Sequence, residues 1–155
     1  MPLIALIVSR FNTAMTSELL AGAERVLTDA GVHATQRPVF WVPGAVELPQ
    51  AAMPLAKSGQ FDAIIAFGVV IRGDTTHYDT VCQMAADGLQ RVSLDTGVPV
   101  VFGVLTCENE TQVWDRLGRQ VGKKGEGHKG EDAARTALEM IDVLRQIKTC
   151  VALSA

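Results

Sequence analysis

A carboxylate, two hydroxyls and a histidine follow one apolar run of this sequence at close spacing. Residues 63–71 are typical of a buried strand, and Arg72 and Gly73 end the run. Asp74, Thr75, Thr76 and His77 come next, where a helical pattern begins. The N–H groups at a helix N-terminus suit a phosphate, and a histidine can move a proton near neutral pH. The run predicts a phosphate-binding turn beside a proton-transfer group; the alternative is an ordinary Thr/Asp helix cap with a surface histidine.

Other apolar runs also end in side chains that could bind a ligand. Phe11 follows the first run, Glu47 follows the second, and Arg116 lies two turns into the helix after the last. The carboxyl ends of parallel strands share one edge of a sheet, where ligands bind. We expect Phe11 to stack on a flat ring, Glu47 to bind hydroxyls and Arg116 to pair with a phosphate. The alternatives are structural: a ring capping the core, a carboxylate at a helix N-terminus, and a surface ion pair of Arg116 with Glu108 or Asp115.

The elements that must position these side chains alternate along the chain. Apolar runs predict strands at residues 3–8, 39–42, 63–71 and 99–105. Helical patterns fall at residues 15–30, 47–57, 77–96, 109–117 and 131–147, the last ending in basic residues. Such alternation predicts an α/β protein: a three-layer α/β/α sandwich around a four-stranded parallel sheet. Continuous Val/Ile/Leu strands agree, because strands of a parallel sheet are buried on both faces.

Composition limits the classes of function. The 155 residues predict a single domain, 1–155, and the net charge of −3 gives no electrostatic footprint for nucleic acid. The three cysteines and three histidines have no ligand spacing, so we expect no metal and a reduced, cytoplasmic protein. No apolar run is long enough to span a bilayer. The glycine- and lysine-rich segment 118–130 follows a helix and lacks the hydroxyl of a nucleotide-binding P-loop.

Several separated motifs, in order, resemble the lumazine synthase family. They carry the resemblance from about residue 3 to residue 144, nearly the whole chain. These motifs are Arg10–Asn12, Trp41–Pro49, Gly68–Asp79, Val98–Thr106, Glu108–Arg116 and Lys129–Met140.

The resemblance implies the penultimate step of riboflavin biosynthesis. A ribitylaminouracil condenses with dihydroxybutanone phosphate to give dimethyl-ribityllumazine, phosphate and water, without cofactor or metal. It also implies a flavodoxin-like fold and a homo-oligomer with sites at subunit interfaces, and a riboflavin synthase is a candidate partner. The rival interpretations are a riboflavin synthase of the archaeal type and a non-catalytic flavin or lumazine carrier.

The resemblance also implies roles by position. His77 would shuttle protons, and Asp74, Thr75 and Arg116 would bind the butanone phosphate. Phe102 would reach the site from a neighbouring subunit. The residues implied for the ribitylaminouracil are Phe11, Ala45, Val46, Glu47, Val69, Val70, Ile71, Phe102 and Lys129.

The chain departs from the family pattern before its last helix. Segment 118–130 is longer than the family's G-T-K-A-G-N-K-G, so the family's lysine corresponds to Lys129 or, alternatively, Lys124. Asp132 would then orient the catalytic histidine. The longer segment, and the little chain that precedes the first strand, favour a pentamer over a decamer or a 60-subunit shell.

Overall fold

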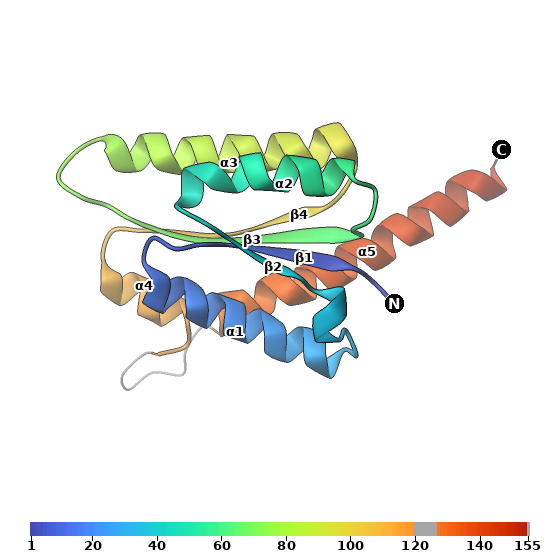
Figure 1. The fold of residues 1–155 in the computed structure, drawn as a ribbon, viewed down its shortest axis with the longest axis horizontal. Helices are drawn as coiled ribbons and strands as arrows, with labels where there is room; N and C mark the ends of the chain where they lie inside the picture. Colours follow the sequence, from blue (N-terminus) through green and yellow to red (C-terminus); the bar gives the residue numbers. More distant parts are fainter. Residues whose placement is uncertain (120–126, 155) are drawn as a thin grey trace.

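Four parallel strands form one sheet in the order β2-β1-β3-β4 (Figure 1). The computed structural model describes residues 1–119 and 127–154. The strands are β1 (Ile4–Ser9), β2 (Val39–Val42), β3 (Ala63–Ile71) and β4 (Val100–Cys107). The helices are α1 (Thr13–Asp29), η1 (Ala34–Gln36), η2 (Ala45–Glu47), α2 (Leu48–Lys57), α3 (His77–Thr96), α4 (Glu110–Arg116) and α5 (Lys129–Leu153).

Helices cover both faces of the sheet. Helices α2 and α3 lie on one face, and α1, α4 and α5 lie on the other (Figure 1). The strands supply both cores in alternation: Leu6 and Val8 pack toward α1 and α5, whereas Ala5 and Ile7 pack toward α2. Every residue of β1 is buried, as a central parallel strand requires. The predicted three-layer α/β/α sandwich is therefore confirmed.

Most predicted elements agree with the structure within a few residues, and the last helix differs most. It begins at Lys129 and runs to Leu153, past the expected end at residue 147. Residues 148–153 contain no glycine or proline, so nothing in the backbone stops the helix after its basic residues. The extended end projects beyond the sheet (Figure 1). A second difference is at residue 47, where a separate turn of 3₁₀ helix, η2, precedes α2.

The strand order creates a crevice at the carboxyl ends of β1 and β3. From β1 the chain first forms β2 on one side, and β3 then pairs with the other side of β1. The connections after β1 and β3 therefore leave the sheet toward opposite faces, and ligands of open α/β sheets bind at such a switch point.

None of the helices within residues 1–119 and 127–154 is long and apolar enough to cross a membrane.

Candidate active site

A cavity of about 530 Å³ opens at this crevice. It is lined by the turns that follow β1, β2 and β3 and by the first two turns of α3. Nine of the residues predicted from the sequence line it: Phe11, Ala45, Val46, Glu47, Val69, Val70, Ile71, Thr75 and His77. Gly44, Gly73, Tyr78 and Val81 complete the wall.

Asn12 holds the aromatic residue at the cavity mouth. Its backbone is left-handed, with φ of 61°, and its side-chain amide donates to the carbonyl of Val69 at 2.9 Å. The N–H of Phe11 donates to the carbonyl of Pro43 at 3.1 Å. Two strand ends therefore fix the turn, while Phe11 stays 71% exposed. An exposed ring on a fixed backbone is suited to stacking on a ligand.

The turn after β2 places a carboxylate inside the cavity wall. The N–H of Glu47 donates to the carbonyl of Gly44 at 3.2 Å, which closes the 3₁₀ turn of η2. A Cβ at Gly44 would lie 3.2 Å from a carboxylate oxygen of Glu47, so the side chain folds back over the glycine. The half-buried carboxylate can accept hydrogen bonds from ligand hydroxyls.

Arg72 braces the turn between β3 and α3. Its guanidinium pairs with Asp79 at 3.2 Å and with Glu108 at 2.7 Å, and it lies 4.4 Å from the centre of the Tyr78 ring. The hydrogen bond to Asp79 raises the pKa of Arg72, and burial raises the pKa of Tyr78. Arg72 is therefore occupied by protein partners, and the braced turn presents the Gly73 and Thr75 positions to the cavity.

His77 is the first residue of α3 and lines the cavity with its side chain exposed. Its backbone N–H donates to the hydroxyl of Thr75 at 3.3 Å. Asp74 lies in the same exposed turn but is not among the lining residues. Within residues 1–119 and 127–154, no three His, Cys, Asp or Glu side chains gather so as to hold a metal ion.

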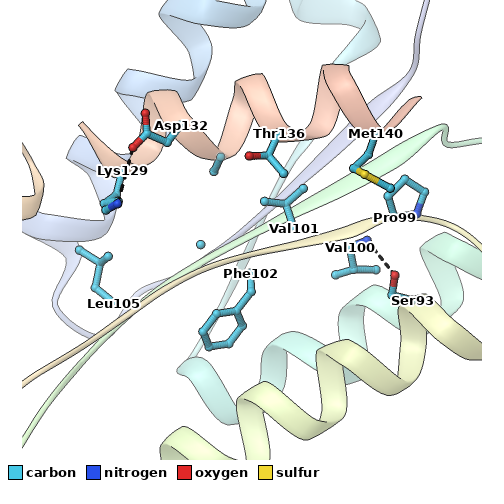
Figure 2. A pocket seen from close by; sticks show the side chains of 12 residues that line it. Ser93, Pro99, Val100, Val101, Phe102, Leu105, Lys129, Asp132, Thr136 and Met140 are labelled. Atoms are coloured by element: carbon cyan, nitrogen blue, oxygen red, sulfur yellow. Dashed lines mark hydrogen bonds and ion pairs between the residues drawn. The ribbon is translucent and has the colours of Figure 1, made fainter. Parts of the chain in front are cut away.

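Three other predicted residues line a second cavity, of about 460 Å³, along the β4 edge. Phe102 is 44% exposed and points from β4 toward α3, whereas Lys129 and Asp132 lie across the strand at the start of α5 (Figure 2). The Lys129 ammonium and the Asp132 carboxylate are 3.8 Å apart. Among residues 1–119 and 127–154 the two cavities share no lining residue, and Asp132 and His77 line different ones.

Arg116 lies outside both cavities. It ends α4, is half-buried, and donates to the carbonyl of Gln112 at 3.2 Å. Glu108, one of its two expected surface partners, pairs with Arg72 instead. The alternative lysine, Lys124, lies outside the described residues, as does most of segment 118–130.

Tyr78 and Val81 belong to the site although neither was predicted from the sequence. Both line the first cavity, one and four residues after His77. Val81 lies four residues after His77 and therefore on the same face of α3, so helical periodicity counted from His77 could have found it. Tyr78 is the next residue along the chain, and that periodicity gives no signal for it.

One comparison with known proteins bears on identity. The family model described as 6,7-dimethyl-8-ribityllumazine synthase matches residues 2–145, which is most of the chain. The match covers every strand and both cavities. The chain therefore belongs to the 6,7-dimethyl-8-ribityllumazine synthase family, and this membership points to lumazine synthesis within riboflavin biosynthesis.

Proposed function

We propose that this protein condenses 5-amino-6-(D-ribitylamino)uracil with 3,4-dihydroxy-2-butanone 4-phosphate. The products are 6,7-dimethyl-8-ribityllumazine, inorganic phosphate and water, which makes the protein a transferase. One observation carries the proposal. A single cavity at the switch point of the sheet gathers an exposed aromatic ring, a carboxylate, a hydroxyl-bearing turn and a histidine, provided by Phe11, Glu47, Thr75 and His77.

The uracil ring has a stacking partner and a hydrogen-bonding edge. The N–H groups of Ile64 and Arg72 donate toward β4, so the odd-numbered residues of β3 direct their backbone groups toward β1. The pairing with β1 ends at Phe67, and the carbonyl of Val69 accepts from Asn12. The backbone of Ile71 then faces the cavity. We assign it to the ring edge, with Phe11 on the ring face and Glu47 on the ribityl hydroxyls.

The phosphate of the second substrate belongs at the turn before α3. Gly73 and Thr75 line the cavity there, beside the N-terminus of a twenty-residue helix. N–H groups and the helix dipole favour an anion at that point. We assign the backbone N–H of Asp74 to the phosphate as well. The side chain of Asp74 has no part in this assignment, because Asp74 is not among the residues that line the cavity. Arg116 lies outside the cavity, so we assign it to the neighbouring copy that completes the site.

His77 is positioned to move the protons of the reaction. The 5-amino group attacks the ketone and loses water to form an imine, and elimination of phosphate leaves an enol that tautomerises to a second carbonyl. The ribitylamino nitrogen attacks this new carbonyl and closes the ring with loss of a second water. Each step transfers protons, and a histidine can give and take them near neutral pH. Holding the phosphate fixes the small electrophile beside the amine, and such proximity can supply much of the rate.

The complete site is shared between two copies of the chain. The β4 edge carries Phe102, Lys129 and Asp132 on a cavity separate from that of His77. When the β4 edge of one copy covers the strand-end cavity of the next, the contact joins two different surfaces, and such head-to-tail contacts form a ring when the rotation between copies closes. This geometry supports a ring, and the resemblance favours five subunits.

A two-substrate assay tests the proposal. Purified protein is mixed with both substrates, and lumazine fluorescence is followed together with phosphate release. Equal rates of the two products, each above a protein-free blank, support the enzyme. Binding of lumazine without acceleration of either product would replace the enzyme with the alternative, a non-catalytic carrier.

A further inference from the structure

A histidine caps the helix that carries two of the proposed site residues. His128 immediately precedes α5, and its Nδ1 accepts the N–H of Gly130 at 3.1 Å and that of Glu131 at 3.4 Å. These are two of the first N–H groups of the helix, which have no partner within it. The opposite ring nitrogen, Nε2, is buried without a hydrogen-bond partner in the part of the chain that the structure describes.

The same ring fixes α5 to α1. A Cβ at Gly22 of α1 would overlap the ring of His128, and a Cβ at Gly130 would overlap the backbone of Leu19. Both glycines are buried, so the first turn of α5 rests directly on α1. His128 also forms an isolated antiparallel bridge with Leu117, next to the end of α4. The cap therefore sits where three helices are joined.

Only the neutral ring can form this cap. An Nδ1 that accepts two N–H groups carries no proton, and a positive ring at a helix N-terminus would oppose the helix dipole. Burial lowers the pKa of His128, and Arg25 on α1 lowers it further. The carboxylates that face the ring raise the pKa but do not offset burial; they are Glu131 and Asp132 on α5 and Glu18 on α1.

We propose that His128 is a positioning residue that docks the first turn of α5 on α1 while the ring is neutral and releases that turn when the ring is protonated. Lys129 follows His128 directly, and Asp132 lies on the same first turn of α5. The carboxylate of Asp132 is 3.8 Å from the ammonium of Lys129. Release would therefore disturb the half of the site that borders the β4 edge. This consequence for the site rests on the proposed function; the docking itself does not.

The direction of the pH effect follows from the lowered pKa. The unfolded chain protonates the ring near pH 6.5, and the folded chain resists protonation to a lower pH. The neutral His128 cap therefore makes its full contribution to the free energy of unfolding above pH 6.5. This contribution is lost as the pH falls from 6.5 through the pKa of His128 in the folded state. At most one proton is involved, which predicts that the Tm falls by no more than about 4 °C per pH unit at the steepest point.

Substitutions that retain an N-cap but do not titrate separate the effect of protonation from the effect of losing the cap. Asn and Asp are the preferred N-caps and do not titrate between pH 5.5 and 7.5. We expect His128→Asn and His128→Asp to fold, and to lose less Tm between pH 7.5 and 5.5 than the wild type. His128→Ala should have a low Tm at both pH values. His33→Asn removes an exposed histidine and serves as the matched control, with the wild-type pH dependence.

Hydrogen exchange locates the effect without using activity. At pH 5.5, peptides that cover residues 128–132 and 18–25 should exchange faster in the wild type than in His128→Asn, and equally at pH 7.5. A parallel fall of Tm in the wild type and in both cap-retaining variants, with equal exchange at pH 5.5, would overturn the proposal. These readouts need no substrate, so they remain decisive even when the two-substrate assay fails.

Activity then tests the consequence for the site. Below pH 6.5 the KM for the ribitylaminouracil should rise in the wild type, while His128→Asn keeps the value it has at pH 7.5. An identical rise in both proteins, alongside the expected difference in Tm, would retain the docking role and remove the link to Lys129 and Asp132.

Discussion

The side-chain amide of Asn12 reaches across the crevice to the carbonyl of Val69 at 2.9 Å and joins the turn after β1 to the end of β3. This contact fixes the separation of two cavity walls. It also occupies the backbone carbonyl of Val69 in β3. The next residue of β3 whose backbone groups face the cavity, Ile71, is left for a ligand. The position of Phe11 depends on it, because Phe11 precedes Asn12 in the same turn.

Replacing Asn12 should weaken binding of the ribitylaminouracil. Asn12→Gly keeps the backbone at φ of 61° accessible and removes only the amide. A lost hydrogen bond of about 1 kcal/mol predicts a KM roughly five-fold higher. Asn12→Ala should show a similar KM and a free energy of unfolding lower by a further ~1 kcal/mol, because alanine is strained at this φ. A normal KM in Asn12→Gly would mean that the amide does not position Phe11.

Alanine at two different glycines should have different effects, one on the stability of the fold and the other on substrate binding. A Cβ at Gly103 would lie 2.5 Å from the ring of Phe67 and 2.7 Å from the carbonyl of Ala66, so Gly103→Ala should lower the free energy of unfolding by about 1–3 kcal/mol. A Cβ at Gly73 meets nothing within 4 Å. Gly73→Ala should therefore keep the wild-type Tm while raising the KM for the butanone phosphate. A Gly73→Ala enzyme with an unchanged KM would place the phosphate elsewhere.

Arg116 should act on the phosphate substrate alone. A hydrogen bond to a charged group contributes roughly 1.5–3 kcal/mol, so Arg116→Ala should raise the KM for the butanone phosphate about 10- to 100-fold. Steady-state kinetics with each substrate varied in turn measure this. Arg91→Ala is the matched control, because the Arg91 side chain is 79% exposed and pairs with Asp95 on the same helix. A change confined to the KM for the uracil would contradict the assignment.

Mixing inactive variants should restore activity. His77→Ala damages the strand-end cavity, and Lys129→Ala damages the β4 edge. In rings of equal composition, about a quarter of the contacts join an intact cavity to an intact edge. Co-expression should therefore recover about a quarter of the wild-type rate, while light scattering confirms a ring of five. Activity no higher than the sum of the separate variants would place each site within one chain.

The sequence predicted the strands better than their arrangement. Residues 63–71 and 77–96 have the predicted bounds, because a continuous apolar run and a clear helical period end at unambiguous polar residues. The position of β1 between β2 and β3 could not be derived, because strands buried on both faces carry no pattern that distinguishes their neighbours.

The site residues that directly follow the carboxyl ends of strands could be predicted from the sequence. Those that lie along the outer strand of the sheet could not. Phe11, Glu47 and His77 line one cavity because parallel strands end together. Phe102 points from the middle of β4, and only the strand order reveals that β4 is an outer strand with an exposed ring. The cap of His128 was missed because the predicted helix began at residue 131, two residues after its actual start at Lys129.

The most direct test of the account is the rate of His77→Ala with both substrates saturating. His77 lines the cavity and its side chain is exposed, so its removal should leave the fold intact. Lumazine formation and phosphate release should fall together, by roughly 10²-fold or more, because general acid–base groups contribute that much. His33→Ala, at an exposed histidine that is not among the lining residues of either cavity, should keep the wild-type rate. An unchanged turnover number in His77→Ala would contradict the central claim.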